Sequence, residues 1–369
     1  MKIGIVKECK EQEYRVAATA SNVFGLTASG HEVYVEEDAG IHAGISNEDY
    51  EVAGAKILQR DEIWAKSDMI YKVKEPLEEE YKYFREDLTI FCYLHLAANG
   101  PLKDALLENK TTAIGYETVE KYGKLPLLRP MSEIGGCIAV QDGAHFLTKT
   151  EKGKGILLQG LPGVAPAHVV VVGGGVAGTG AVRTAVGIGA RVTVVDIDVH
   201  RLAKLADIFG PRLETLYSNQ YNLQRAIKTA DLVVGAVLVP GGRTPKIVTR
   251  DMVHSMEEGG VIVDIAIDQG SCVETMDHAT FHNDPVYIKD GILHYAVANI
   301  PGKVPRAATQ ALSNVTGKYA KLLADEGINE GILHHESLKK GVNTYQGHIV
   351  HPKVAEAFDE PYRPLEELM

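Results

Sequence analysis

The sequence predicts an α/β protein of two doubly wound parallel-sheet domains, and three observations support this. A valine-rich run, His168 to Val172, passes into a glycine-rich turn and a helix-length segment before a second strand, Arg191 to Asp196. The first part of the chain alternates short apolar runs with amphipathic stretches, which is typical of parallel βα units. The chain has 369 residues, too many for one ordinary core, so two domains are expected.

The first domain is expected to contain a parallel sheet with helices between its strands. Amphipathic stretches at 20–29 and 102–109 are interpreted as helices. The long segment 307–326 has apolar residues at helical spacing and is expected to return the chain to this domain, which we place at residues 1–129 and 306–369. The apolar runs predict strands at 3–6, 32–35, 69–73, 89–93 and 112–115.

The second domain is expected to span residues 130–305. A helix is predicted to open at Ser132, next to the acidic Glu133, and to run through Gln141. Further βα units follow the glycine-rich turn. Their buried strands are predicted at 231–239, 260–267 and 294–298.

The glycine-rich turn has the G-x-G-x-x-G spacing of a dinucleotide-binding Rossmann unit. Gly173 permits the tight turn, Gly175 lets the backbone approach a pyrophosphate, and Gly178 lets the helix pack on the strand. The N–H groups at the start of the helix suit phosphates. Asp196 ends the second strand, where it can accept both ribose hydroxyls and repel a 2′-phosphate. The predicted cofactor is therefore NAD, and Asp198 is the competing acid.

Composition and charge narrow the function classes. The net charge of −11 argues against a general nucleic-acid surface. No uninterrupted apolar stretch reaches membrane-spanning length, and the N-terminus enters a strand without a signal-peptide core. The four cysteines are scattered without metal-ligand spacing. We expect a cytoplasmic protein with no membrane segment and no metal site.

Polar side chains at strand ends are the candidates for chemistry, because ligands bind beyond the carboxyl ends of parallel strands. In the first domain these are Arg15 after the first strand, Lys72 and Lys74 at the end of the third, and His95 after the fourth. Arginine binds a carboxylate through a planar fork, lysine adds positive charge, and histidine titrates near neutrality.

In the second domain the same rule selects Asp268 and Asn299. Asp268 could orient water or ammonia and balance the positive charge of an iminium. Together with the groups of the first domain, it would line a cleft between the domains. This set suits hydride transfer at the α-carbon of a small amino acid.

Several sequence blocks together resemble the L-alanine dehydrogenase family over essentially the whole chain. The blocks are Glu13–Ala17, Lys72–Pro76, Leu94–Ala98, Pro130–Glu133, Asp264–Gly270 and Val297–Pro301. The resemblance implies reversible oxidation of L-alanine by NAD to pyruvate and ammonium. It also implies His95 and Asp268 as catalytic residues, Arg15 and Lys74 as substrate ligands, and a homohexamer.

The resemblance further implies a set of cofactor ligands. At the position of Arg201 relatives can carry Lys, and either cation could flank the adenosine. The implied ligands are Ser132, Gly173, Gly175, Val176, Ala177, Gly178, Asp196, Arg201, Ser218, Val237, Leu238, Ile265, Asp268 and Asn299.

Three other functions compete with this one. The NAD-binding portion of a proton-translocating transhydrogenase shares the architecture, but it would lack the Lys74 and His95 pair and would adjoin membrane spans. A saccharopine-type dehydrogenase would need room for a long basic amine. A non-catalytic NAD(H) sensor would retain the glycine turn without the four catalytic candidates.

Overall fold

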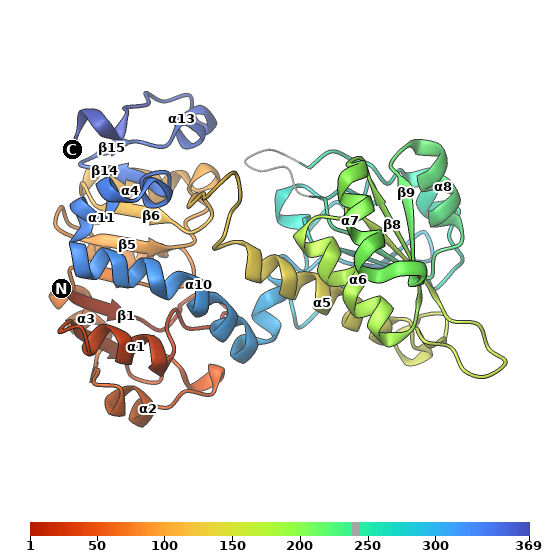
Figure 1. Ribbon diagram of the computed structural model, residues 1–369, viewed down its shortest axis with the longest axis horizontal. Coiled ribbons are helices and arrows are strands. Elements are labelled where there is room, and N and C mark those ends of the chain that lie inside the picture. The colour runs from red at the N-terminus through yellow and green to blue at the C-terminus, as the bar shows by residue number, and fades with distance from the viewer. Residues whose placement is uncertain (238–243) are drawn as a thin grey trace. The chain divides into compact units, whose positions relative to one another are not determined.

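The computed structural model describes residues 1–237 and 244–369, so the predicted cofactor ligand Leu238 lies outside the described residues. The chain forms two compact units (Figure 1). The first unit is Met1–Pro130 together with Val304–Met369, and the second is Met131–Lys303. The expected domain crossings, after residues 129 and 305, lie beside these bounds. Both ends of the chain belong to the first unit.

The sheet of the first unit has a parallel core with strand order β6-β5-β4-β1-β2-β3. Two strands from the C-terminal tail, which the sequence pattern does not predict, extend it antiparallel beyond β6. The short, partly exposed β3 is a further addition to the predicted strands. The strands are β1 Lys2–Ile5, β2 Glu32–Glu36, β3 Lys56–Leu58, β4 Met69–Tyr71, β5 Thr89–Cys92, β6 Thr112–Gly115, β14 Val342–Tyr345 and β15 His348–Ile349.

Helices connect these strands, and the long α10 returns the chain to the first unit as expected. Tyr71 on β4 lies 2.5 Å from the Thr316 hydroxyl of α10, and both groups are buried. The helices are α1 Ala20–Thr27, α2 Asn47–Val52, α3 Arg60–Lys66, α4 Gly100–Glu108, α10 Pro305–Glu326, α11 Ile328–His334, α12 Glu336–Lys339 and α13 Pro352–Phe358, with the 3₁₀ helices η1 Ile41–Ala43, η2 Glu78–Tyr83, η3 Leu96–Ala98 and η8 Leu365–Glu367.

The sheet of the second unit has a parallel core with strand order β9-β8-β7-β10-β11-β13. β12 pairs antiparallel with β13 at the edge of this sheet. β12 and its hairpin are additions to the predicted strands. Asp290 and Gly291 join β12 to β13, both with positive φ, as a tight hairpin turn requires. The strands are β7 His168–Val172, β8 Arg191–Asp196, β9 Leu213–Tyr217, β10 Leu232–Gly235, β11 Val261–Asp264, β12 Val286–Lys289 and β13 Ile292–Tyr295.

The helix expected to open at Ser132 begins earlier, at Arg129, because Pro130 fits the first turn of a helix. Ser132 therefore lies inside this helix, α5 Arg129–Phe146, and does not cap it. The remaining helices are α6 Val176–Ile188, α7 Val199–Phe209, α8 Gln220–Lys228 and α9 Arg250–His254, with η4 Lys149–Glu151, η5 Gly210–Arg212, η6 Ile267–Gln269 and η7 Ile300–Lys303.

Three predicted strands of the second unit have different bounds from those expected. β11 stops at Asp264, whose buried carboxylate accepts a hydrogen bond from the Ala266 N–H at 2.8 Å and turns the chain. β13 begins at Ile292, because the hairpin turn ends at Gly291. The expected strand over 231–239 ends at Gly235, and residue 239 lies outside the described residues.

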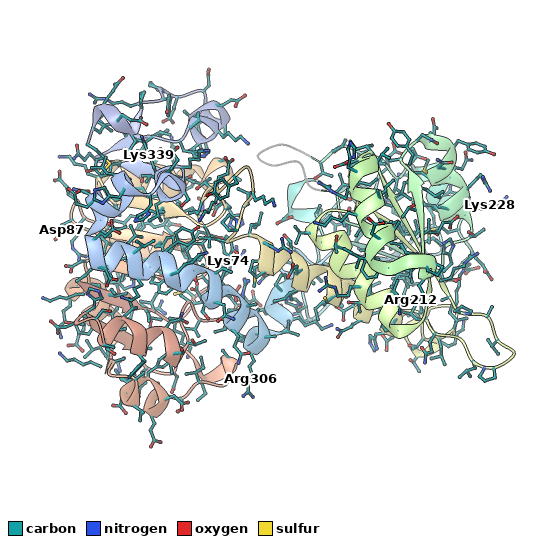
Figure 2. All side chains as sticks on the ribbon, in the orientation of Figure 1. Lys74, Asp87, Arg212, Lys228, Arg306 and Lys339 are labelled. Atoms are coloured by element: carbon teal, nitrogen blue, oxygen red, sulfur yellow. The ribbon has the colours of Figure 1, made fainter. Side chains whose placement is uncertain are left out.

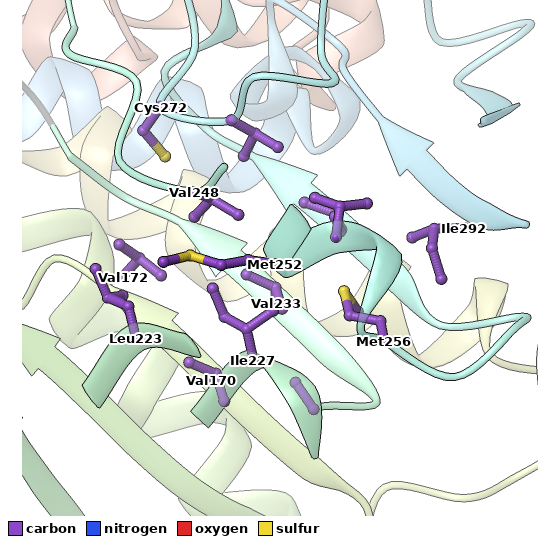
Figure 3. Packing of buried hydrophobic residues seen from close by; sticks show 14 of the residues in the cluster. Val170, Val172, Leu223, Ile227, Val233, Val248, Met252, Met256, Cys272 and Ile292 are labelled. Atoms are coloured by element: carbon purple, nitrogen blue, oxygen red, sulfur yellow. The ribbon is translucent and has the colours of Figure 1, made fainter. Parts of the chain in front are cut away.

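The core of the second unit is built from strand valines and from the apolar faces of α8 and α9. Val170, Val172 and Val233 lie against Ile227 and Met252, and none of the five is more than 2% exposed (Figure 3). The valine runs are recognisable as buried strands because both faces of a parallel sheet are covered.

Both sheets have the doubly wound order 3-2-1-4-5-6 in their parallel cores, which confirms the predicted fold class. In each, the strand order reverses beside the first strand: between β1 and β4 in the first unit, and between β7 and β10 in the second. Ligands of such folds bind at this switch point. The described part of the chain contains no helix long and apolar enough to cross a membrane.

Candidate active site

Arg15 lies in the irregular segment between β1 and α1, next to the switch point of the first sheet. Its guanidinium is buried and forms a bidentate ion pair with Glu13, with Nε to Oε1 at 2.6 Å and Nη2 to Oε2 at 2.5 Å. Burial opposes the charged form, but Glu13 more than compensates, and the pKa of Arg15 lies above its usual value. The pair fixes the plane of a permanent cation at this edge of the sheet.

Lys74, which is labelled in Figure 2, follows β4 on the other side of the switch point. Its side chain is half-buried. Burial, reinforced by the positive charge of Arg15, lowers the pKa of Lys74. Two of the predicted substrate ligands are thus close enough to repel each other. A bound carboxylate would relieve that repulsion, because it would pair with both cations.

His95 directly follows Leu94 beyond the end of β5 and is partly exposed, with its Nδ1 3.4 Å from Oε2 of Glu75. The other carboxylate oxygen of Glu75 lies 2.5 Å from Nζ of Lys10. Burial alone would raise the pKa of Glu75, but the contact with His95 and the charge of Lys74 hold it below its usual range. Glu75 is therefore an anion that faces Nδ1 of His95.

Lys72, which the sequence selects together with Lys74, has a different environment. Its ammonium is fully buried, 2.8 Å from Glu80 and 3.7 Å from Glu8. Burial raises the pKa of Glu8 to about 7, although Lys72 pulls it down. Glu8 also accepts the N–H of Val73 at 2.6 Å. Lys72 therefore belongs to an internal ion network that supports the strand end.

A cavity of about 120 Å³ lies beside this cluster, lined by Glu8, Lys10, Glu13, Arg15 and His42 among others. A larger open depression of about 690 Å³ lies over α1 and α2. It contains none of the predicted site residues, and its volume is mostly open to solvent. Of these two cavities, the smaller one contains a predicted substrate residue, Arg15.

In the second unit the glycine turn is built as the motif requires. Gly173 has φ +100°, and a Cβ on Gly178 would lie 1.8 Å from the Gly173 carbonyl oxygen. Gly175 is the N-cap of α6, and no side chain among the described residues caps that end. Val176 and Ala177 follow as the first residues of α6. The N–H groups of the first turn are thus available to an anion, as pyrophosphate binding needs.

Asp196 ends β8 with its carboxylate oriented by the backbone. Oδ2 accepts the Gly174 N–H at 2.6 Å, and Oδ1 accepts the Asp198 N–H at 2.8 Å. A carboxylate has further lone pairs for two ribose hydroxyls. Asp198, the competing acid, instead accepts the N–H groups of His200 and Arg201 as the N-cap of α7. These observations fit the adenosine end of NAD at Asp196.

Other predicted cofactor ligands surround this turn. The half-exposed Arg201 places Nη1 3.6 Å from Asp196 Oδ2. Ser218 follows β9, and its N–H donates to the Asp196 carbonyl at 2.9 Å. Val237 follows β10 at the switch point, where its side chain would lie 3.2 Å from a Cβ on Gly173. These three residues therefore lie around the same sheet edge.

α5 brings Ser132 into the second unit through a close helix contact. A Cβ on Gly136 would lie 2.0 Å from the Ala177 carbonyl oxygen of α6, and one on Gly135 would lie 3.2 Å from the Ile265 side chain. Two further predicted residues lie in loops of the second unit. Asp268 is exposed on η6, and the Asn299 carbonyl accepts the Gly302 N–H at 2.9 Å just before η7.

Four acidic residues of the first unit were not predicted as site residues: Glu8, Glu13, Glu75 and Glu117. Glu13 and Glu75 lie inside the quoted blocks beside Arg15 and Lys74. Glu117 follows β6, so the strand-end rule that selects His95 also selects it. Their partners depend on strand register, which the sequence does not display.

The fold and the glycine turn define an α/β protein with a dinucleotide-binding unit, and the first unit has a cluster of charged side chains at its sheet edge. Family models match both parts of the chain: "Alanine dehydrogenase/PNT, N-terminal domain" over residues 4–135 and "Alanine dehydrogenase/PNT, C-terminal domain" over residues 139–352. The chain belongs to the alanine dehydrogenase/PNT family.

Individual relatives agree with this assignment. The chain is 50% identical to the alanine dehydrogenase of Methanococcus maripaludis, over all of both chains. It is also 50% identical to that of Staphylococcus haemolyticus, over 100% of this chain and 99% of the relative. A solved L-alanine dehydrogenase superposes with a TM-score of 0.94 at 47% identity, covering 97% of this chain and 99% of that one. A transhydrogenase from Sinorhizobium meliloti, at 24% identity and a TM-score of 0.80, shares the fold.

Proposed function

We propose that this protein is an NAD-dependent L-alanine dehydrogenase. It converts L-alanine, NAD⁺ and water to pyruvate, ammonium, NADH and a proton, and it runs in reverse. The observation that carries the proposal is the convergence of Arg15, Lys74 and His95 on one edge of the first sheet. The full-length similarity to alanine dehydrogenases supports the choice of substrate.

Arg15 and Lys74 hold the substrate. The planar guanidinium, fixed by Glu13, binds the carboxylate of alanine, and the ammonium of Lys74 binds the carboxylate or the developing carbonyl oxygen. A lowered pKa suits Lys74 to this role, because a substrate anion restores the stability of its charged form.

His95 acts as the general acid–base group. Glu75 faces Nδ1, so Nδ1 carries the hydrogen toward the carboxylate and Nε2 is left for the substrate. In the forward direction His95 accepts the proton of the attacking water as it adds to the iminium carbon, and it returns a proton to the leaving amine. We assign Asp268 as the second catalytic group, which orients that water and balances the iminium charge.

The second unit holds the cofactor, which supplies a hydride acceptor when bound. We assign the pyrophosphate to the N–H groups of Gly175, Val176 and Ala177, and the adenosine ribose to Asp196. The further ligands follow the family pattern: Ser132, Gly173, Gly178, Arg201, Ser218, Val237, Leu238, Ile265, Asp268 and Asn299.

We further propose that residues 1–129 and 306–369 act as the substrate domain and residues 130–305 as the NAD-binding domain. The protein functions as a cytoplasmic homohexamer in L-alanine catabolism. The four free thiols agree with that compartment. Light scattering on the purified protein tests the hexamer, and any other mass at working concentration contradicts it.

The decisive experiment measures NADH formation from a panel of L-amino acids at mildly alkaline pH, and NADH oxidation with pyruvate plus ammonium. The panel contains alanine, serine and 2-aminobutyrate, and glyoxylate is added in the reverse direction. Turnover of alanine with reversal by pyruvate supports the proposal. If only another amino acid of the panel is turned over, that amino acid replaces alanine as the proposed substrate. If the protein binds NADH but turns over none of them, the result contradicts the proposal and favours the transhydrogenase-like or sensor alternative.

A further inference from the structure

The backbone of His95 adopts a left-handed conformation, which is uncommon for residues other than glycine. Its φ and ψ are 48° and 35°, in the left-handed region, and it directly precedes η3. This conformation is uncommon outside glycine and costs energy, so the surroundings must hold it. The imidazole is delivered to the sheet edge by this turn.

The sheet ladder ends just before His95. The Tyr93 N–H donates to the Val73 carbonyl just after β4 at 2.9 Å, and the Tyr116 N–H donates to the Cys92 carbonyl at 2.8 Å. Beyond these bonds, no neighbouring strand supplies a backbone acceptor for the N–H groups of Leu94 and His95 in the described structure. Leu94 is fully buried, so its N–H needs a partner.

Glu117 supplies that partner for both groups. Cys92 pairs with Gly115 in the parallel register of β5 and β6, so Glu117 extends that register opposite Leu94. Its Oε1 accepts the His95 N–H at 2.5 Å and the Leu94 N–H at 3.1 Å, and its Oε2 lies 3.2 Å from the Leu94 nitrogen. One carboxylate thus replaces two missing ladder acceptors.

We infer that Glu117 is a positioning residue for His95, which fixes the left-handed turn through the backbone N–H groups of residues 94 and 95. This inference rests on the proposed function, since it assumes that His95 handles the protons. Glu75 and Glu117 then have separate roles, because Glu75 faces the ring nitrogen and Glu117 holds the main chain. Neither contributes an atom to the reaction.

The test compares Glu117→Ala with Glu117→Gln, and with Glu120→Ala as the control. Glu120 lies on the same loop but forms an exposed ion pair with Lys340. In Glu117→Ala we expect kcat to fall about 10²-fold, the scale of a misplaced catalytic group, with NADH affinity unchanged. Glu117→Gln keeps one acceptor oxygen, so it should recover most of that loss. Glu120→Ala should match the wild type.

The pH profile of kcat separates positioning from direct participation. If Glu117 acts only through the backbone, its substitution lowers the maximum kcat of the pH profile. The pH values at which kcat falls on either side stay unchanged. Three results would overturn the inference: normal turnover in Glu117→Ala, a parallel loss of NADH binding, or a Gln variant as slow as Ala with one limb missing. The last would make Glu117 a proton carrier itself.

The proposed function fails in a distinguishable way. If His95→Ala keeps normal turnover, the role of His95 is lost and the inference falls with it. If His95→Ala is inactive and Glu117→Ala is not, only the inference falls. Circular dichroism and thermal unfolding of each variant show whether a slow variant is also a misfolded one, and the Gln variant decides the question if Ala does not fold.

Discussion

The two units share one strand order, but their candidate sites consist of different groups: charged side chains in the first unit and mainly backbone N–H groups in the second. In the first unit the edge is made of charged side chains that pair with one another, such as Arg15 with Glu13 and His95 with Glu75. In the second, the edge is made of backbone at the glycine turn, with one carboxylate at Asp196. The proposed substrate carboxylate would pair with charged side chains, whereas the proposed pyrophosphate site offers the N–H groups and positive end of a helix.

The same contrast appears in backbone conformation. Gly173 has φ +100° and needs no support, because glycine adopts that angle freely. His95 has φ 48° and depends on an acceptor that follows another strand. A site that needs a reactive side chain at a sharp turn must therefore supply an external anchor, and a site that needs only backbone does not.

Removal of the His95 imidazole should have the largest effect on turnover. It should also distinguish the two units most clearly, because it should lower kcat without changing NADH binding. In His95→Ala we expect kcat to fall by about 10²–10⁴, the usual contribution of a general acid–base group. NADH binding should not change measurably, because the proposed cofactor site lies in the second unit. Steady-state kinetics and fluorescence titration measure the two quantities.

His334→Ala is the matched control for that experiment, since His334 lies exposed on α11 against Glu326 and Glu330. It should keep wild-type turnover. Near-normal activity of His95→Ala would remove the residue from the mechanism.

The next largest effect is expected on the preference for NAD over NADP. Asp196→Ala removes an acceptor for the ribose hydroxyls and the charge that repels a 2′-phosphate. Hydrogen bonds to charged groups contribute about 1.5–3 kcal/mol, so the NAD over NADP ratio of kcat/KM should fall about 10-fold or more. Asp198→Ala should lose about 1 kcal/mol of stability as a helix cap and keep the preference. An unchanged ratio in Asp196→Ala would transfer the role to Asp198.

The glycine architecture of the second unit can be tested where α5 meets α6. In Gly136→Ala the new Cβ would lie 2.0 Å from the Ala177 carbonyl oxygen and 2.7 Å from the Ala181 nitrogen. Overpacking of this kind costs about 1–3 kcal/mol in the free energy of unfolding. Gly187→Ala on α6 meets nothing within 4 Å and should stabilise the protein by about 0.5–1 kcal/mol. Urea unfolding of both variants measures the difference, and equal stabilities would contradict the close contact.

A pH-dependent effect on stability is expected from the buried carboxyl of Glu8. Its pKa is raised from 4.5 in the unfolded chain to about 7 in the folded protein. Its contribution to stability is therefore complete below the unfolded pKa and is lost as the pH rises through the folded one. One pKa unit corresponds to about 1.4 kcal/mol.

Glu8→Gln cannot ionise and escapes this loss. From about pH 5 to pH 8 the stability of the variant should therefore rise relative to the wild type, by an amount on the order of 1–3 kcal/mol. Thermal unfolding of both proteins across this range measures it. Parallel pH profiles would show that Glu8 does not titrate there.

The fold class was predictable because its causes are local. Buried valine runs, the glycine spacing and the acid at Asp196 each leave a trace in a short stretch of sequence. The hairpin at Asp290 and Gly291 has such a trace too, an Asp-Gly pair between apolar runs, although we did not predict it. The strands of the tail have none, since β14 pairs antiparallel with a strand far back in the chain.

The candidate site was predictable as a set of strand ends but not as a set of contacts. The rule that ligands bind beyond parallel strands selects Lys74 and His95 without any structure. It does not tell which of two lysines is internal: Lys72 is buried between two glutamates, and Lys74 reaches the edge. Nor does it tell that Glu117 bonds to His95, because that contact requires the register of two strands.

The first unit is assembled from both ends of the chain, and the second is an insertion within it. A ribosome therefore releases every residue of the inserted unit before it supplies α10, although α10 packs Leu312 and Thr316 into the unit that began first. Domains generally fold as units in the order of their synthesis. Here the order is inverted: the second unit can fold first, and the first unit becomes complete only when the last part of the chain is synthesised.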